Sequence, residues 1–192
     1  NSSTAPYSED QIADRPISPY AASKRAGELL VHSYHHLYGL AAVCLRFFTV
    51  FGPRQRPDLA IHKFSKLMKA GQALPIYGDG ESGRDYTYVD DAVEAIVRSL
   101  RLTGANDVTP CYEVLNVGRS EPVTLNELLD HLATALNQKP QLDRLPDQPG
   151  DVAFTSASTE RIERVLGFRP RVGLDEGLER FATWLDSVAA ND

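Results

Sequence analysis

The chain has 192 residues, 42% of them hydrophobic, and a formal net charge of −6 at pH 7, values that are ordinary for a folded globular protein. A sequence pI near 5.4 excludes a broad basic surface for nucleic acid or anionic lipid, so a few well-placed cations must hold any anionic ligand. No apolar run approaches the roughly 18–20 residues of a membrane span. We therefore expect no nucleic-acid partner and no membrane segment.

The two cysteines and the N-terminus indicate the cellular setting. Cys44 and Cys111 lie in apolar, strand-like runs without the spacing of a metal site, so we expect buried, reduced thiols and a cytoplasmic location. The N-terminus lacks the basic-then-apolar order of a signal peptide. Because it also lacks methionine, we expect a chain that starts in the middle of a longer protein.

The first regular element in chain order is a helix over residues 20–38. Ser18 and Pro19 are favoured at a helix N-cap and first turn, and Gly39 is suited to a C-cap. Leucines between these signals recur at helical spacing. The apolar run 41–48 that follows predicts a buried parallel strand.

Strands and helices then alternate to the C-terminus. Residues 51–58 interrupt regular structure and lead into a helix with an apolar face, which carries Ile61, Phe64, Leu67 and Met68. Further strands are predicted at 74–77, 86–89 and 114–118, and further helices at 90–100, 124–136, 159–166 and 175–189. Thr124 and Glu127 have the spacing of a capping box. This alternation favours an α/β fold with a parallel sheet.

A glycine pattern at 78–83 matches GxGxxG, the pattern of a dinucleotide-binding turn. That pattern binds pyrophosphate only where it follows a strand and opens a helix. Here the next residues, 84–89, are strand-like, and Asp79 places an acid inside the would-be phosphate cradle. We interpret the segment as a loop between two strands, so the sequence contains no nucleotide fingerprint of its own.

Tyr20 and Lys24 form the constellation that carries chemistry. They stand four residues apart on the predicted helix, so they share one face. A neighbouring cation stabilises a phenolate, which allows a tyrosine to act as a general base near neutral pH. Such a pair is also common on ordinary surface helices, so the pair alone does not establish a function.

The surrounding segments give the pair a context. Residues 18–28 resemble the active-site helix of the extended short-chain dehydrogenase/reductase family, and segments 45–53, 78–91 and 148–151 resemble that family in the same order. The resemblance covers nearly the whole chain and is specific for members that modify nucleotide sugars. It implies a Rossmann-type parallel sheet, here truncated, with a smaller C-terminal α/β domain that binds substrate.

The resemblance also implies a mechanism with NAD as cofactor. Tyr20 takes a proton from the sugar 4-hydroxyl while the hydride at C4 passes to NAD, and Lys24 binds the nicotinamide ribose. Phe47 is expected beside the same cofactor. In an epimerase the resulting 4-keto sugar rotates and receives the hydride on its other face. NAD is therefore recycled and stays bound.

Other matches imply a site for a nucleoside diphosphate. Arg84 resembles the family's diphosphate-binding arginine, and a guanidinium suits bidentate contact with phosphate. Tyr77 matches a position whose ring packs on the nucleobase, with core packing as the alternative. Asp151 resembles the acid that binds the nucleotide ribose. Gln148 stands where many relatives have an arginine, which leaves one cation fewer for the diphosphate.

Two residues bear on the sugar. Thr49 replaces the asparagine of most family members, and Thr49 with Arg56 is similar to UDP-glucuronate 4-epimerases, in which Arg56 would face the C5 carboxylate. The alternative is that Arg56 is a solvated loop residue next to the helix after Asp58. Arg54 and Gln55 resemble the wider group of UDP-hexose epimerases, so both substrate classes stay open.

The resemblance divides the chain into two parts. Residues 1–48 and 85–118 are expected to be the remnant of a dinucleotide-binding domain, and 49–84 and 119–192 a substrate-binding domain. The glycine turn and the catalytic Ser or Thr are expected upstream, so the chain alone should be inactive. Alternatives to the epimerase are a nucleotide-sugar 4,6-dehydratase or decarboxylase, and a non-catalytic binding or assembly module.

The predicted helix also bears on assembly and metals. Members of the family pair through it, and His32, Tyr34 and Leu37 give it an apolar outer face, so we expect a homodimer through residues 18–38. His32, His35 and His36 lie at helical spacing, but no carboxylate or cysteine joins them at ligand spacing. We expect no metal site there.

Overall fold

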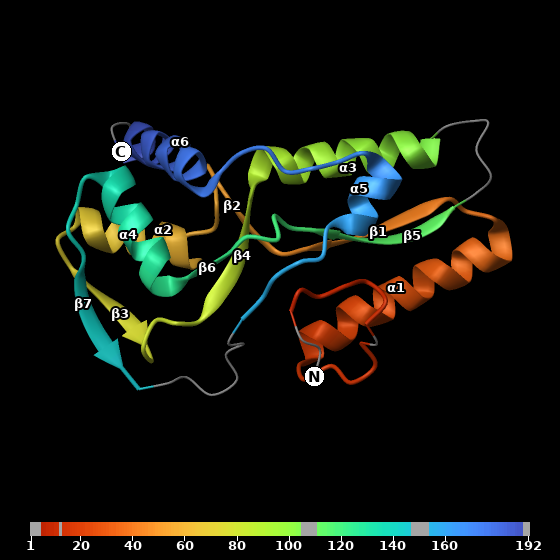
Figure 1. Ribbon diagram of the computed structural model, residues 1–192, viewed down its shortest axis with the longest axis horizontal. Coiled ribbons are helices and arrows are strands. Elements are labelled where there is room, and N and C mark those ends of the chain that lie inside the picture. The colour runs from red at the N-terminus through yellow and green to blue at the C-terminus, as the bar shows by residue number, and fades with distance from the viewer. Residues whose placement is uncertain (1–4, 12, 105–110, 147–153, 190–192) are drawn as a thin grey trace.

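The computed structural model describes residues 5–11, 13–104, 111–146 and 154–189. Its elements in chain order are α1 (Pro19–Tyr38), β1 (Ala42–Phe47), β2 (Thr49–Phe51), α2 (Ala60–Lys69), β3 (Ala73–Tyr77), β4 (Gly83–Tyr88), α3 (Val89–Gly104), β5 (Tyr112–Val117), β6 (Pro122–Thr124), α4 (Leu125–Leu136), β7 (Gln141–Leu145), α5 (Glu160–Leu166) and α6 (Leu174–Ala189). They form two lobes (Figure 1). The α1 lobe comprises α1, β1, β5, α3 and α5, and the α4 lobe comprises α2, β3, α4, β7 and α6 together with β2, β4 and β6, which lie on its side toward the α1 lobe.

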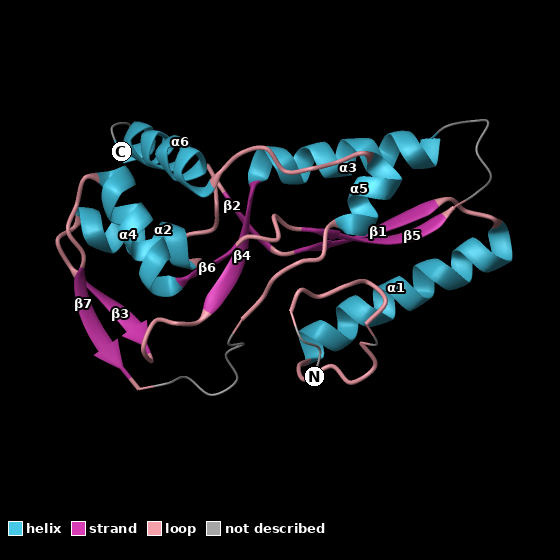
Figure 2. Ribbon diagram, viewed as in Figure 1, coloured by secondary structure: helices cyan, strands magenta, loops and turns pink. Residues whose placement is uncertain are grey.

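The α1 lobe is a three-layered arrangement around two parallel strands. β1 and β5 pair from Ala42 opposite Tyr112 to Phe47 opposite Val117. α1 covers one face of this pair, and α3 and α5 lie on the other (Figure 2). Its buried hydrophobic residues are Ala95, Leu115, Val117, Ile162 and Phe168. The parallel α/β arrangement expected from the sequence is thus confirmed.

The predicted helix over residues 20–38 is confirmed together with both of its caps. The Ser18 hydroxyl accepts the Ala21 N–H at 3.1 Å, which satisfies one of the free amides of the first turn. Gly39 adopts a left-handed conformation with φ of 65°, and its N–H donates to the His35 carbonyl. The caps fix where α1 begins, one residue before Tyr20.

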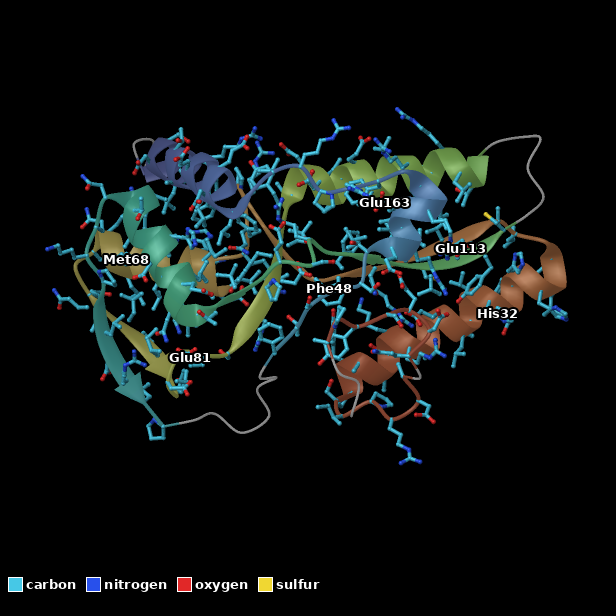
Figure 3. All side chains as sticks on the ribbon, viewed as in Figure 1. His32, Phe48, Met68, Glu81, Glu113 and Glu163 are labelled. Carbon is cyan, nitrogen blue, oxygen red and sulfur yellow. The ribbon has the colours of Figure 1, made fainter. Side chains whose placement is uncertain are left out.

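The α4 lobe holds the larger core of the molecule. Helices α2, α4 and α6 pack together, and their apolar faces meet the strands β3 and β4. The buried residues of this core are Phe51, Ile61, Phe64, Met68, Leu74, Ile76, Tyr86, Tyr88, Leu128, Leu129, Leu132, Leu178, Phe181 and Leu185. Figure 3 shows Met68 in this lobe. The capping box predicted at the start of α4 is present.

Three short strands were not predicted from the sequence. β2 pairs in parallel with β4, β6 pairs antiparallel with β4, and β7 pairs in parallel with β3. β7 carries mostly exposed side chains, so it lacks the apolar run or alternation that signals a strand. β2 and β6 have only three residues each, too few to show a period. The helix predicted at 90–100 is longer and runs as α3 to Gly104.

The glycine pattern at 78–83 joins two strands. β3 ends at Tyr77, and β4 begins at Gly83. Gly78 and Gly80 have φ of 70° and 82°, conformations that glycine adopts without strain. Because a strand rather than a helix follows, the rejection of this segment as a dinucleotide-binding turn is confirmed.

The expectation of two buried cysteines was wrong. Cys44 and Cys111 are free thiols, but both are only partly buried. Among the described strands β1 pairs with β5 alone, so its other edge is open and the whole strand is more exposed than predicted. In the described ranges no helix combines the length and apolar character needed to cross a membrane.

Candidate active site

The first two turns of α1 present Tyr20 and Lys24 together. The Lys24 Nζ lies 5.3 Å from the centroid of the Tyr20 ring, a distance at which the cation is attracted to the aromatic face. Tyr20 is 71% exposed. The spacing of the two residues therefore produces the expected juxtaposition, with the phenol open to a ligand.

Phe47 and Thr49 lie where the chain crosses from the α1 lobe into β2. Phe47 ends β1 and is exposed, and Thr49 begins β2 opposite Tyr86 of β4. Figure 3 shows the intervening Phe48 between the two lobes, and its N–H donates to the Val117 carbonyl at 3.0 Å. This crossing brings the carboxyl end of a parallel strand to the lobe junction, the usual place for a ligand in α/β sheets.

Arg84 and Tyr77 flank the glycine loop. Arg84 lies in β4, partly buried, and its Nη1 donates to the Gly83 carbonyl at 2.9 Å. Tyr77 ends β3 and is 46% exposed, so its ring lies at the surface of the α4 lobe rather than in its core. Both side chains come from the ends of strands, β3 and β4, whose other residues pack into the core of the α4 lobe.

Arg56 pairs with a neighbouring carboxylate. Its Nη2 lies 2.8 Å from Asp58 Oδ2 and its Nε 3.2 Å from Oδ1, in an exposed loop before α2. The guanidinium holds the pKa of Asp58 below its ordinary value. This geometry matches the second interpretation of Arg56, a solvated loop residue, more closely than a free cation awaiting a substrate.

Two predicted ligand residues, Gln148 and Asp151, lie outside the described residues. The histidines of α1 have other partners. His32 and His35 pack against the ring of Tyr112, and His35 Nδ1 lies 2.7 Å from the Leu40 carbonyl. Within the described ranges, no group of three or more His, Cys, Asp or Glu side chains could hold a metal ion.

An ion-pair network that sequence reasoning missed attaches α1 to β1. Arg46 Nε and Nη2 donate to the two carboxylate oxygens of Glu28 at 2.7 and 2.8 Å, and Arg25 Nη1 adds a contact at 2.7 Å. The hydrogen bond from Arg46 is the main cause that lowers the pKa of Glu28. An arginine inside an apolar strand run is the signal that could have predicted a buried partner. The network fixes the helix eight residues after Tyr20.

His62 attaches the loop that carries Arg56 to α2. It is a buried residue of α2, its Nδ1 lies 2.6 Å from the Gln55 carbonyl, and its ring packs edge-on against Phe181 and Trp184. No sequence pattern predicted this contact, because a single histidine on an apolar helix face has no partner at a recognisable spacing.

Known proteins share this arrangement. A probable UDP-glucuronate 4-epimerase from Rhizobium meliloti is 39% identical over 194 residues, which cover 94% of this chain and 57% of that protein. A crystal structure of UDP-glucuronic acid 4-epimerase from Bacillus cereus, in complex with UDP-glucuronic acid and NAD, has 33% identity and a TM-score of 0.87, with 97% of this chain and 58% of that chain covered. A crystal structure of UDP-glucose 4-epimerase from Thermotoga maritima with UDP-glucose has 32% identity and a TM-score of 0.88. The match covers 98% of this chain and 60% of that chain. The chain thus spans a little over half the length of these relatives.

The parallel α/β fold and these similarities together indicate a class of proteins, the NAD-dependent epimerases and dehydratases of nucleotide sugars. The profile of the GDP-mannose 4,6-dehydratase family matches residues 1–181, and the chain therefore belongs to this family. The resemblance inferred from segments 18–28, 45–53 and 78–91 is confirmed at this level.

Proposed function

We propose that the chain is the active-site helix and substrate-binding part of an NAD-dependent nucleotide-sugar 4-epimerase. The observation that carries the proposal is the Tyr20–Lys24 pair, which is exposed on the first two turns of α1, at the end of the helix that lies toward the carboxyl end of β1. Similarity to 4-epimerases from three bacteria supports the same reaction. The substrate is a UDP-hexose or a UDP-hexuronate.

Tyr20 acts as the base and Lys24 as its activator. The ammonium stabilises a phenolate over the neutral phenol, so Tyr20 can accept the proton of the sugar 4-hydroxyl. Loss of that proton and of a hydride from C4 gives a 4-keto sugar. After the sugar turns over in the site, the hydride would return to the opposite face of C4, which inverts that centre, while Tyr20 returns the proton to the oxygen at C4.

The donor chemistry of α1 fits one end of NAD. A phenol and an ammonium side by side suit the ribose hydroxyls next to the nicotinamide, and Phe47 offers an exposed ring at the same strand end. The described residues contain no glycine turn before a helix for the pyrophosphate. When bound, NAD supplies the acceptor for the hydride at C4 and returns it. The role of this chain is to hold the sugar against that acceptor.

The nucleotide is held by the α4 lobe. Arg84 binds the diphosphate, Tyr77 packs its ring on the base, and Gln148 and Asp151 complete the diphosphate and ribose contacts. The half-exposed ring of Tyr77 supports this role, since a core tyrosine would have no face free for a base. This leaves the sugar directed toward the lobe junction, where Tyr20 and Thr49 lie.

Thr49 and Arg56 recognise a carboxylate at C5 of the sugar. Arg56 is already paired with Asp58, but an exposed pair contributes only about 0–1 kcal/mol, so a better-placed carboxylate can replace Asp58. The hexuronate is the better of the two substrates if Arg56 makes this exchange. If the pair with Asp58 persists in the complex, a neutral UDP-hexose is the substrate.

The second candidate is a 4,6-dehydratase or decarboxylase of nucleotide sugars, which the name of the matching family favours. These reactions share the oxidation at C4 and therefore the same Tyr20 and Lys24. A dehydratase needs an additional acid pair to eliminate water. A non-catalytic binding or assembly module is the third candidate, and the exposed Tyr–Lys pair is the feature that speaks against it.

Product analysis tests the proposal. The full-length protein that carries this chain is incubated with UDP-glucuronate or UDP-glucose, and the products are separated by anion-exchange chromatography and identified by NMR. The 4-epimer of either substrate supports the proposal, whereas a 4-keto-6-deoxy sugar or a pentose would favour the second candidate. No turnover of either substrate with NAD present would contradict both. The 192-residue chain, assayed in parallel, should be inactive.

We also propose a homodimer through α1. None of its 20 residues is buried, and Leu29, Leu30, Tyr34, Leu37 and Tyr38 are all exposed. Apolar area of this extent on one helix is typical of an interface. In light scattering, the full-length protein should have the mass of a dimer, and Leu37→Arg should shift it to monomer. Leu100→Arg on α3 is the control, because Leu100 is exposed to a similar extent, 64% against 67%, but lies on another face.

A further inference from the structure

Asp85, next to Arg84 in β4, is a fully buried carboxylate whose partners are backbone amides. Its Oδ1 accepts the N–H of Arg119 at 2.8 Å, and its Oδ2 accepts those of Ser120 at 3.0 Å and Ala157 at 2.9 Å. A carboxylate with three such bonds is fully satisfied without a cation. One side chain therefore ties together three segments that are distant in sequence.

The turn at residues 118–120 has a backbone conformation that directs its N–H groups at the Asp85 carboxylate. Ser120 has φ of 62°, a conformation that non-glycine residues rarely adopt, and it lets two successive N–H groups converge on one anion. Gly118 is equally constrained, since an added Cβ would lie 2.8 Å from Asp85 Oδ2 and 2.5 Å from the Ala157 Cβ. The turn is thus built around the carboxylate.

Residues 154–157, which also contact Asp85, are linked to Arg84 through the carbonyl of Gly83. The Gly83 oxygen accepts both the Nη1 of Arg84 at 2.9 Å and the N–H of Thr155 at 3.0 Å. Phe154 forms a parallel bridge with Gly83, and its ring occupies the space that a Cβ on Gly83 would need. Displacement of residues 154–157 would therefore move the carbonyl that orients the guanidinium.

The register of β4 depends on the same contacts. β6 pairs antiparallel with β4, with Arg84 opposite Val123 and Asp85 opposite Pro122. The turn that Asp85 holds, Arg119 and Ser120, leads directly into β6. One carboxylate thus fixes both the turn that leads into β6 and the segment around Ala157 beside β4.

We propose that Asp85 is a positioning residue for the nucleotide diphosphate: it clasps the 119–120 turn and Ala157 against β4 and thereby sets the direction of Arg84. The proposal rests on the proposed function, in which Arg84 binds the diphosphate. Asp85 itself touches no substrate. Its loss should weaken nucleotide binding and raise KM, with little effect on the proton transfer by Tyr20 and hence on kcat.

Asp91 supplies a matched control. It is also a buried carboxylate, 5% exposed, and it accepts the N–H groups of Arg171 and Val172, both at 3.0 Å. It lies in the first turn of α3, and its carboxylate bonds to residues 171 and 172, which meet the 119–120 turn only through the Arg119 side chain on the Val172 carbonyl. Asp85→Asn and Asp91→Asn therefore remove comparable anchors, of which only the first bonds directly to the backbone of the segments beside Arg84.

The experiment measures the affinity of the full-length protein for UDP by calorimetry, together with kcat and KM for the UDP-sugar that it turns over. Asp85→Asn should weaken UDP binding about tenfold to hundredfold, the range for one lost charge-assisted contact, whereas Asp91→Asn should bind UDP like the wild type. In the Arg84→Ala background, Asp85→Asn should add less than about twofold, because the two residues act as one unit.

Gly118→Ala gives a second route if Asp85→Asn fails to fold. The added methyl pushes the 118–120 turn away from Asp85 without changing the carboxylate, so the affinity for UDP should again fall. Gly173→Ala is the control, because a Cβ there meets no atom within 4 Å, and it should leave the affinity for UDP unchanged. Unchanged UDP affinity in the folded Asp85 or Gly118 variants would overturn the proposal, as would equal losses for Asp85→Asn and Asp91→Asn. A wild-type protein that does not bind UDP would instead overturn the proposed function, and this inference with it.

Discussion

The two lobes are stabilised in different ways. The α4 lobe has a continuous core of fourteen buried hydrophobic residues, and α4 itself contributes Leu128, Leu129 and Leu132. The α1 lobe has five such residues, and none of them comes from α1. α1 is held instead by the ion pair of Glu28 with Arg46, by the hydrogen bond from the Tyr112 hydroxyl to the Glu28 carbonyl, and by the packing of His32 and His35 on the Tyr112 ring.

This difference teaches how the chain divides its tasks. A helix fixed by a few directional polar contacts keeps its apolar face and its reactive residues available to other surfaces. A lobe with a well-packed core offers rigid strand ends, on which Tyr77 and Arg84 can hold a nucleotide. In the proposed function, chemistry belongs to the α1 lobe and recognition to the α4 lobe, and the difference in packing matches that division.

The largest effect is expected where chemistry is removed without a change in recognition. Tyr20→Phe in the full-length protein should lower kcat about a hundredfold to ten-thousandfold, the usual contribution of a general base, and leave UDP-sugar affinity nearly unchanged. Steady-state kinetics and calorimetry give the two quantities. The control is Tyr38→Phe at the other end of α1. A Tyr20→Phe variant with near-normal turnover would exclude Tyr20 as the base.

Leucine truncations test the difference in packing. Leu132→Ala in α4 should lower the free energy of unfolding of the 192-residue chain by about 2–5 kcal/mol, because it leaves a cavity in a closed core. Leu30→Ala on the exposed face of α1 should change it by less than about 0.5 kcal/mol. Urea denaturation measures both. Equal losses would mean that α1 is packed as tightly as α4.

The polar attachment of α1 predicts a pH dependence. Glu28→Gln should cost about 1.5–3 kcal/mol at pH 7, since hydrogen bonds to a charged partner are weakened. Because the pKa of Glu28 is lowered in the folded state, its contribution is complete above its ordinary value of 4.5 and disappears as the pH falls through the lowered value. Urea denaturation at pH 7 and in acid should show the two proteins converging. A constant difference would rule out this pair as the anchor.

Recognition of the sugar gives an expected effect of the same size as the attachment of α1. If Arg56 binds the C5 carboxylate, Arg56→Ala should reduce the preference for UDP-glucuronate over UDP-glucose about tenfold to hundredfold, equivalent to about 1.5–3 kcal/mol. Specificity constants for both substrates provide the test, with Arg54→Ala as the control from the same loop. If both substrates lose equally, or neither does, Arg56 remains the partner of Asp58 and does not select the substrate.

The sequence was informative where local signals determine structure. Ser18, Pro19 and Gly39 define the ends of α1, and Thr124 with Glu127 defines the start of α4, because caps act within one turn. The Tyr20–Lys24 juxtaposition follows from helix geometry alone. These are the parts of the fold and the site that neighbouring residues decide.

The contacts that organise the rest join distant segments and leave no local pattern. Asp85 and Asp91 bind backbone amides, which every residue type presents, so no partner can be identified from the sequence. The pairing of Arg56 with Asp58 is local, but it depends on the loop conformation that His62 stabilises through the Gln55 carbonyl. β7 was missed because its exposed residues give no apolar period.

The bridge between Tyr7 and Ala157 has a consequence for the order of events during synthesis. Tyr7 donates its N–H to the Ser156 carbonyl and accepts the N–H of Ser158 and the side-chain amide of Asn116. Residues 156 and 158 lie about 150 positions after Tyr7, so at about 5–20 residues per second the ribosome needs roughly 8–30 s between them. The stretch leading to Tyr20 can therefore dock only after residues 156–158 have been made. Closure of this bridge is thus a step that follows the synthesis of α1, α2, α3 and α4.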